Sequence, residues 1–181
     1  GADDAAAPAA ADDPRLDASV AVLTCIHTPG CRDLFVVAHR GEHLRHPENS
    51  LAGLRAAAEM GVDLVEIDVR HSSDEVVVLM HDADVNRTTD GSGDVATLTF
   101  AAISELTLLG SDAADPESLR VPRFDDTLAL ARELGVALYI DKKTDRSDLV
   151  LADIVAGQYQ DVALLRDELP GLQAASSQAP E

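Results

Sequence analysis

The hydrophobic pattern alternates between short apolar runs and stretches with helical spacing. Four mostly apolar runs predict buried strands, at Leu34–Ala38, Leu64–Val69, Glu75–Met80 and Val136–Ile140. Apolar residues recur on one face, and so predict helices, at Glu48–Met60, Thr99–Leu109, Asp125–Leu134 and Ser147–Ala156. Gly61 and Gly135 follow two of these helices and predict their ends. Alternating strands and helices indicate a parallel sheet, either open and doubly wound or part of a (β/α)8 barrel.

The two ends of the chain lack this alternation. Residues 1–17 are rich in Ala, Asp and Pro and predict a flexible tail, and residues 173–181 predict a second, polar tail. Between the first tail and the first strand, Ser19–Leu23 is predicted to be a strand or a covering segment. The chain begins with Gly1 and has no signal-peptide pattern, as expected for an exported protein after processing or for a fragment.

Charge and hydropathy exclude two classes of partner. The chain has 33 acidic and 14 basic residues, and its formal net charge of -19 would repel nucleic acids and anionic membranes. No apolar run approaches the roughly 18 to 20 residues of a membrane-spanning helix. The expected partner is therefore a small molecule.

Cys25 and Cys31 are the only cysteines, and Pro29 and Gly30 lie between them. They are predicted either to close a small disulfide loop in an oxidising compartment or to be two unpaired thiols. A metal site is less favoured, because only His27 lies nearby as a third soft ligand. A disulfide would indicate a periplasmic or secreted protein, while a cytoplasmic location stays open.

Charged residues gather where the predicted strands end. Glu66 and Asp68 are two positions apart, so both carboxylates project from one face of their strand. Asp141 ends another strand, and parallel α/β folds place their active sites at these ends. Three such carboxylates would hold Ca²⁺ or Mg²⁺, although ion pairing within an acidic chain is the alternative. No glycine-rich phosphate loop follows the first strand, which argues against a nucleotide-binding fold.

Histidines and cations also end these strands. His39 and His81 would act as general acid and base, since imidazole titrates near neutral pH, although a lone histidine is more often structural. Arg40 and Lys143 would bind a phosphate group; their alternative role is salt bridging to the carboxylates.

In order along the chain, these residues resemble the glycerophosphodiester phosphodiesterase family. The resemblance rests on Ala38-His39-Arg40-Gly41, Pro47-Glu48-Asn49-Ser50, Glu66-Ile67-Asp68-Val69 and His81-Asp82. It continues through Asn86–Gly93, Val121–Phe124 and Asp141-Lys142-Lys143, and covers about residues 34 to 143. The ordered combination is far more specific than any single motif.

The resemblance implies a (β/α)8 barrel of the TIM type with a small insertion after its second strand, at about residues 81–120. It implies hydrolysis of glycerophosphodiesters to glycerol 3-phosphate and an alcohol. By the same matching, the metal ligands are Glu66, Asp68 and Asp141, and the acid/base pair is His39 and His81. The matching also implies phosphate contacts at Arg40 and Lys143 and supporting groups at Glu48 and Asn49. The sequence departs from the family's pattern at two places. Asp141 stands where the family often has Glu, and Arg123 and Phe124 replace the usual small polar and aliphatic pair.

A full barrel usually needs about 250 residues, so residues 18–172 are expected to form only the N-terminal half to two-thirds of one. The segment Asp161–Leu172 resembles the helix before the fifth barrel strand, and a strand before it is expected to be missing. Open sheet edges would then favour self-association. Two alternatives to the phosphodiesterase remain, an inactive family member that serves as an interaction module and a phospholipase of the sphingomyelinase D type. The leaving alcohol is not predicted.

Overall fold

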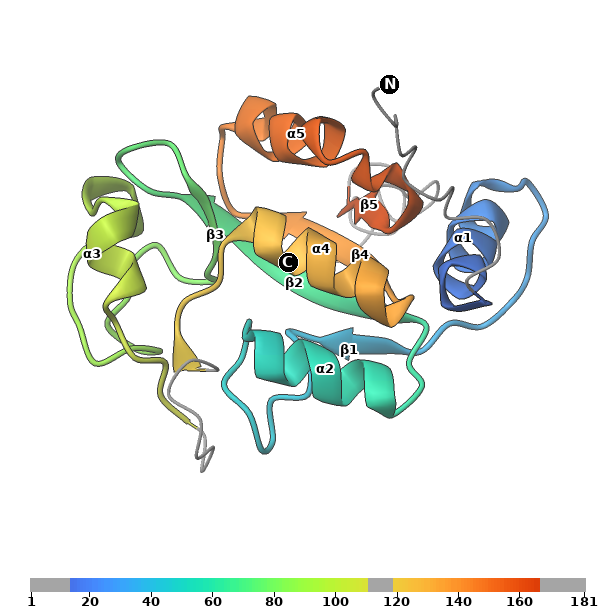
Figure 1. Ribbon diagram of the computed structural model, residues 1–181, viewed down its shortest axis with the longest axis horizontal. Helices are drawn as coiled ribbons and strands as arrows, with labels where there is room; N and C mark the ends of the chain where they lie inside the picture. Colours follow the sequence, from blue (N-terminus) through green and yellow to red (C-terminus); the bar gives the residue numbers. More distant parts are fainter. Residues whose placement is uncertain (1–13, 111–118, 167–181) are drawn as a thin grey trace, which may run out of the picture.

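A computed structural model describes residues 14–110 and 119–166 of the chain, and its centre is one mostly parallel sheet (Figure 1). The parallel strands are β1 (Val37–His39), β2 (Leu64–His71), β4 (Ala137–Lys142) and β5 (Ala163–Leu165), in the order β1-β2-β4-β5. β3 (Val77–Leu79) pairs antiparallel with β2. Four parallel strands are half the number in a (β/α)8 barrel.

Helices α2 (Leu51–Glu59), α4 (Phe124–Leu134) and α5 (Ser147–Ala156) cover one face of the sheet (Figure 1). Their apolar side chains form the main core with Val65, Ile67 and Val69 of β2. Gly135 caps α4 in the left-handed conformation, as the sequence predicted. Since Val65, Ile67 and Val69 point toward the helices, Glu66 and Asp68 point to the opposite face.

Helix α1 (Pro14–His27) lies at the end of the sheet where the strands begin (Figure 1). Its Leu23 packs against the first residues of two strands, Leu64 and Ala137, and against Leu164. The helix starts inside the segment predicted as a flexible tail, and Ser19–Leu23 is part of it, so the covering alternative is correct and the strand alternative is wrong. Cys25 and Cys31 form a disulfide between the end of α1 and the turn that follows.

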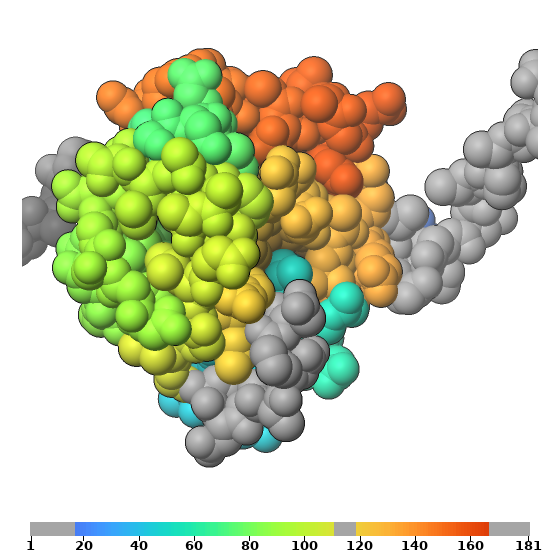
Figure 2. Space-filling model, turned by 60° about the vertical axis from the view of Figure 1, so that its left-hand side comes forward, coloured from blue at the N-terminus to red at the C-terminus, as the bar shows by residue number. Residues whose placement is uncertain are grey.

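Between β3 and α4 the chain forms a second packed region, the insertion (Figure 2). It contains the 3-10 turn η1 (Val95–Thr97) and α3 (Phe100–Ser104), around a second small core that also includes Val78 of β3. The predicted helix Thr99–Leu109 is wrong beyond Ser104, because Thr107 and Leu108 form bridges with Arg120 and Thr89. The turn between β2 and β3 lies against the start of α5, where Arg146 pairs with Glu75.

Two further predictions are corrected. The run Leu34–Ala38 is not a buried strand: β1 covers only Val37–His39, and Leu34 and Val36, which precede it, are 97% and 61% exposed. Among the described strands, β1 pairs with β2 alone. In the predicted helix Asp161–Leu172, residues 162–165 are not helical: the 3-10 turn η3 (Tyr159–Asp161) ends before them, and β5 follows next to β4. No strand is therefore missing before them. The rest of that predicted helix, residues 167–172, lies outside the described residues. The same holds for the predicted tail 173–181 and for residues 1–13 of the predicted tail 1–17.

No helix within the described ranges has both the length and the apolar character needed to cross a lipid bilayer.

Candidate active site

Three carboxylates meet at the ends of neighbouring strands. Asp68 lies opposite Asp141 in the register of β2 and β4, and Glu66 is one step earlier on the same face. One oxygen from each of the three lies within 4.8 Å of the others, and all three side chains are largely buried. Burial and the charges of Asp68 and Asp141 raise the pKa of Glu66 to about 7. The predicted metal-ligand trio is therefore brought together in space.

The buried carboxylate of Asp68 is only partly neutralised. Asn49 donates to its Oδ2 at 3.0 Å, while the Asp68 N–H donates to the Asn49 Oδ1 at 3.0 Å. The guanidinium Nε of Arg40 lies 3.2 Å from the same Oδ2. The other oxygen, Oδ1, is buried and accepts no hydrogen bond from the described residues, with the Lys143 ammonium 3.4 Å away. An oxygen of this kind, next to two other carboxylates, fits a hard divalent cation.

The loop between β1 and α2 supplies Arg40, Glu48 and Asn49 to this cluster. The Arg40 N–H donates to Glu66 Oε2 at 2.9 Å, and its guanidinium donates to Glu48 Oε1 at 3.0 Å. Both Arg40 and Asn49 have left-handed backbones, with φ of 57° and 54°. Because few residues other than glycine adopt this conformation, the loop is held in shape by its side-chain contacts.

Two cations converge on Asp141. Lys143 donates to its Oδ2 at 2.8 Å, and Arg166, which follows β5, donates to the same oxygen at 2.5 Å. Burial lowers the pKa of Lys143, but its hydrogen bond to Asp141 and the charges of Asp141 and Asp68 outweigh the effect of burial, so the pKa is raised. Lys143 is where the sequence predicted it, beside the carboxylates. Arg166 was not predicted, since nothing in its sequence surroundings marks it.

The two predicted catalytic histidines reach this cluster by different routes. His39 ends β1; its side chain is 64% exposed and its Nε2 lies 3.9 Å from Glu66 Oε2. Burial of the ring and the charge of Arg40 lower the pKa of His39. His81 follows β3, and its Nδ1 lies 2.7 Å from Asp82 Oδ1. A carboxylate at Nδ1 fixes the tautomer of an imidazole and leaves Nε2 to meet a substrate.

A second network, which sequence reasoning missed, ties His81 to the rest of the site. Arg87 donates to both oxygens of Asp82, at 2.6 and 3.1 Å, and to both oxygens of Glu48, at 2.8 Å each. The hydrogen bonds from Arg87 and His81 lower the pKa of Asp82, and that from Arg87 lowers the pKa of Glu48. Asp82 had a signal in the sequence, because it directly follows His81. Nothing in the sequence pairs Arg87 with Glu48.

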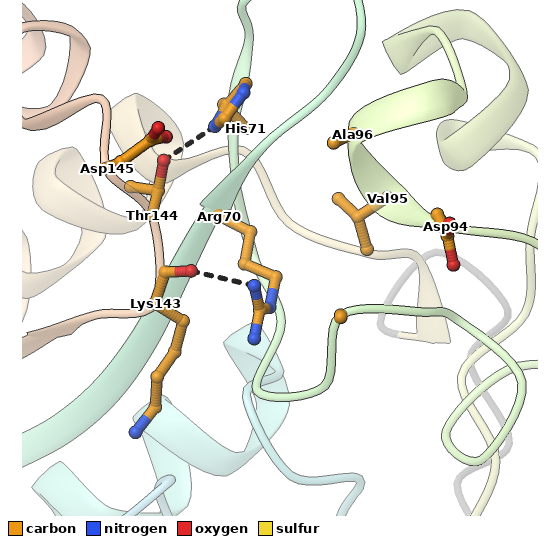
Figure 3. A pocket seen from close by; sticks show the side chains of 9 residues that line it. Arg70, His71, Asp94, Val95, Ala96, Lys143, Thr144 and Asp145 are labelled. Carbon is orange, nitrogen blue, oxygen red and sulfur yellow. Dashed lines mark hydrogen bonds between the residues drawn. The ribbon is translucent and has the colours of Figure 1, made fainter.

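A cavity of about 420 Å³ opens between the ends of β2 and β4 and the insertion (Figure 3); Lys143 lines it, whereas the three carboxylates and the two predicted catalytic histidines do not. Arg70, His71 and residues 143–145 form one wall and Asp94–Ala96 form the other. The cavity has room for part of a small polar ligand, and cationic and anionic side chains line it.

The geometry agrees with the comparisons to known proteins. Residues 39–169 match the family model described as the glycerophosphoryl diester phosphodiesterase family. The chain is 36% identical over 129 residues to human glycerophosphodiester phosphodiesterase 1, an alignment that covers 64% of this chain and 38% of the human protein. It is 42% identical over 71 residues to the glycerophosphodiester phosphodiesterase of Caldanaerobacter subterraneus, covering 39% of this chain and 29% of that protein.

Solved structures give the same result. The glycerophosphodiester phosphodiesterase of Agrobacterium tumefaciens aligns with a TM-score of 0.66 at 29% identity, covering 81% of this chain and 64% of that one. An Oleispira antarctica phosphodiesterase, solved in complex with the product sn-glycerol-3-phosphate, aligns with a TM-score of 0.62 at 28% identity, covering 82% of this chain and 63% of that one. These alignments confirm the predicted barrel-type fold. The chain spans less than two thirds of either solved structure, and less than half of the two curated relatives.

Proposed function

Because this chain belongs to the glycerophosphoryl diester phosphodiesterase family, we propose that it hydrolyses glycerophosphodiesters to glycerol 3-phosphate and an alcohol. The observation that carries the proposal is the convergence of Glu66, Asp68 and Asp141 with the cations Arg40 and Lys143 on one face of the sheet. The substrate would be a small molecule whose phosphate enters between these groups.

We propose Glu66, Asp68 and Asp141 as the ligands of a divalent cation, Ca²⁺ or Mg²⁺. Three buried carboxylates repel each other, and Asp68 Oδ1 lacks a hydrogen-bond donor among the described groups, so the site gains stability from a cation. When bound, such a cation offsets the charge on the phosphoryl oxygens. Asn49 would keep Asp68 oriented through its two hydrogen bonds, and Glu48 would hold Arg40.

Arg40 and Lys143 are the proposed phosphate contacts. In the absence of substrate they pair with the carboxylates Asp68 and Asp141, and a phosphodiester would compete for the same donors. Arginine offers a bidentate fork to phosphate oxygens, whereas lysine offers a single point charge. Together they would stabilise the negative charge that develops during cleavage.

His81 is the proposed general acid and His39 the proposed general base. The hydrogen bond to Asp82 would orient the imidazole of His81, which in its protonated form protonates the leaving alcohol from Nε2. His39 would take the proton from the attacking hydroxyl, which in this family is expected to be the substrate's own glycerol hydroxyl. That attack expels the alcohol and leaves a cyclic glycerol phosphodiester; water would then add to phosphorus and break the new P–O bond, which gives glycerol 3-phosphate.

The direct test is release of glycerol 3-phosphate from glycerophosphocholine by the 181-residue chain, with Ca²⁺ or Mg²⁺ and with chelator. We expect cation-dependent release that falls by roughly 10²–10⁴-fold in His39→Ala and His81→Ala, as for other general acid/base residues. His27→Ala serves as the control, because His27 lies in α1 at the opposite end of the sheet. Release that survives in both histidine variants would contradict the mechanism.

Further assays on the same purified protein distinguish the proposed function from its two alternatives. A phospholipase of the sphingomyelinase D type would release choline from sphingomyelin, so this lipid is assayed in parallel. An inactive family member that serves as an interaction module would release neither product while still binding Ca²⁺ or Mg²⁺.

We further propose that the chain self-associates through the open edges of its sheet. Within residues 14–110 and 119–166, β1 pairs with β2 only, and the nearby Leu34, Val36 and Val37 are exposed. Exposed strand edges with apolar flanks pair readily with other chains. Light scattering on purified protein is expected to give a mass of about two chains, and Val36→Lys is expected to lower it. A monomer at every concentration tested would contradict self-association.

The disulfide between Cys25 and Cys31 supports a periplasmic or secreted location over a cytoplasmic one. Fractionation of the source cells tests this proposal, with thiol labelling of the isolated protein as a second measurement. Recovery of the protein from the cytoplasm with two free thiols would contradict it.

A further inference from the structure

Arg70 lies on the same face of β2 as the proposed cation ligands. Its position, two residues after Asp68, continues the series that begins with Glu66 and Asp68. The side chain is partly buried and enters the space between the end of β4 and the insertion (Figure 3). It is therefore the next inward-facing group on this strand, and the mechanism above does not use it.

The guanidinium joins two segments that lie far apart in the sequence. Its Nε and Nη2 donate to the main-chain oxygen of His81, at 3.0 and 2.9 Å. Its Nη1 donates to the main-chain oxygen of Lys143 at 2.7 Å (Figure 3). Arg70 thus links the segment carrying one catalytic histidine to the segment carrying a proposed phosphate contact.

The hydrogen bonds of Arg70 go to main chain and not to charge. Within residues 14–110 and 119–166, no carboxylate lies within ion-pair distance of its guanidinium. A planar guanidinium presents donors in fixed directions, so it holds two carbonyls at a set separation. A lysine ammonium at this position would reach one of the two carbonyls, and a methionine would reach neither.

We propose that Arg70 is a positioning residue that fixes His81 relative to Lys143. This inference rests on the proposed function, because it assigns Arg70 to the same reaction. The side chain of Asp82 orients the imidazole of His81, and Arg70 holds the main chain of His81. With both contacts in place, the acid and the phosphate contact face one substrate; without Arg70, each segment moves independently.

The test compares Arg70→Met and Arg70→Lys with a matched control, Arg132→Met. Arg132 also donates to two main-chain oxygens, those of Gly157 and Gln158, but it joins α4 to the segment before β5. The readout is nuclear magnetic resonance of the histidine imidazoles and of the amide of Lys143. The His81 signal is assigned by its loss in His81→Ala.

We expect Arg70→Met to shift and broaden the signals of both His81 and Lys143. Arg70→Lys is expected to perturb them less, and Arg132→Met is expected to leave them unchanged. Unchanged signals in Arg70→Met would overturn the proposal. If Arg70→Met does not fold, Arg70→Lys decides alone, and loss of folding in both variants would make Arg70 a structural residue and overturn the proposal as well.

Kinetics supply a second readout. In Arg70→Met, loss of the alignment between His81 and Lys143 is expected to lower kcat by about 10–100-fold. KM should change by less than about threefold, because the side chains that bind the substrate are retained. An equal loss in Arg132→Met would contradict a local role. If the unsubstituted chain releases no glycerol 3-phosphate, the proposed function fails, whereas the resonance measurement still decides whether Arg70 couples His81 to Lys143.

Discussion

One face of the sheet is apolar at the end where the strands begin and acidic at the end where they finish. At the start, Leu64 and Ala137 pack under Leu23 of α1 in a small apolar cluster. Only two to four residues further along these strands, Glu66, Asp68 and Asp141 form a buried acidic cluster. The apolar end gains stability from burial, while the acidic end buries three carboxylates whose mutual repulsion is offset in part by Arg40, Lys143 and Arg166. Substitutions at the two ends should therefore separate stability from activity.

The largest effect is expected at the acidic end, in Asp68→Asn. This change keeps the shape of the side chain but removes the charge at the centre of the trio. Activity should fall by roughly 10³-fold, which corresponds to several kcal/mol of lost cation and phosphate stabilisation. The melting temperature in chelator should change little, because the relief of repulsion between carboxylates is offset by the lost pairing with Arg40 and Lys143. Glycerol 3-phosphate release and calorimetry measure the two quantities, and Asp148→Asn, an exposed residue paired with Arg146, is the control.

At the apolar end, Leu64→Ala should have the opposite profile. Leu64 is 3% exposed, and its truncation is expected to lower the free energy of unfolding by about 2–5 kcal/mol. Activity per folded molecule should be unchanged at low temperature. Denaturant unfolding measures the loss, with Met60→Ala as the control because Met60 is 65% exposed. A large loss of activity without loss of stability would contradict the division between the two ends.

A smaller effect on activity is expected from Asp82→Asn, which weakens the contact at Nδ1 of His81. Removing such an orienting carboxylate typically lowers activity by about 10–100-fold. Asp125→Asn is a matched control, since Asp125 accepts two hydrogen bonds from Arg123, as Asp82 does from Arg87. The pH profile of kcat should also change in Asp82→Asn alone. An unaltered profile would argue against His81 as the acid.

The smallest effect is a pH dependence of stability at Glu66. Its pKa is raised from 4.5 to about 7, so the folded state holds this proton more tightly than the unfolded state. In chelator, stability should fall as the pH rises from about 4.5 to about 7, and Glu66→Gln should lack this fall. We expect a difference of about 2–8 °C in melting temperature between the two proteins across this range.

A bound cation should reverse that trend, because it binds the ionised carboxylate and stabilises the folded state. Added Ca²⁺ or Mg²⁺ should therefore raise the melting temperature more at pH 8 than at pH 5. Equal stabilisation at both pH values would show that Glu66 is not a ligand.

The acidic end was the more predictable of the two from sequence. Glu66 and Asp68 lie two residues apart on one strand, so the period of a strand alone places them on one face. The same reasoning extends to Arg70, which was overlooked. Arg87 could not be predicted as a partner of Glu48, because their contact depends on how the insertion folds back on the sheet.

The errors at the other end have a physical cause. Leu34–Ala38 is apolar enough for a buried strand, but burial depends on neighbours, and β1 has a strand on one side only. Ser19–Leu23 is too short a run to distinguish strand from helix by its pattern. Residues 163–165 form a strand because β4 offers them a free edge, a long-range pairing that local sequence does not encode.

The left-handed backbones of Arg40 and Asn49 have a consequence for how the site meets its ligands. Each unfavourable conformation costs about 1–3 kcal/mol, which the rest of the fold offsets beforehand. The loop is therefore already in its working shape when a substrate arrives, and no binding energy is used to order it. The side-chain contacts of Arg40 and Asn49 hold this left-handed backbone in place, and a β-branched residue at position 49 should disturb the site because it disfavours that backbone conformation.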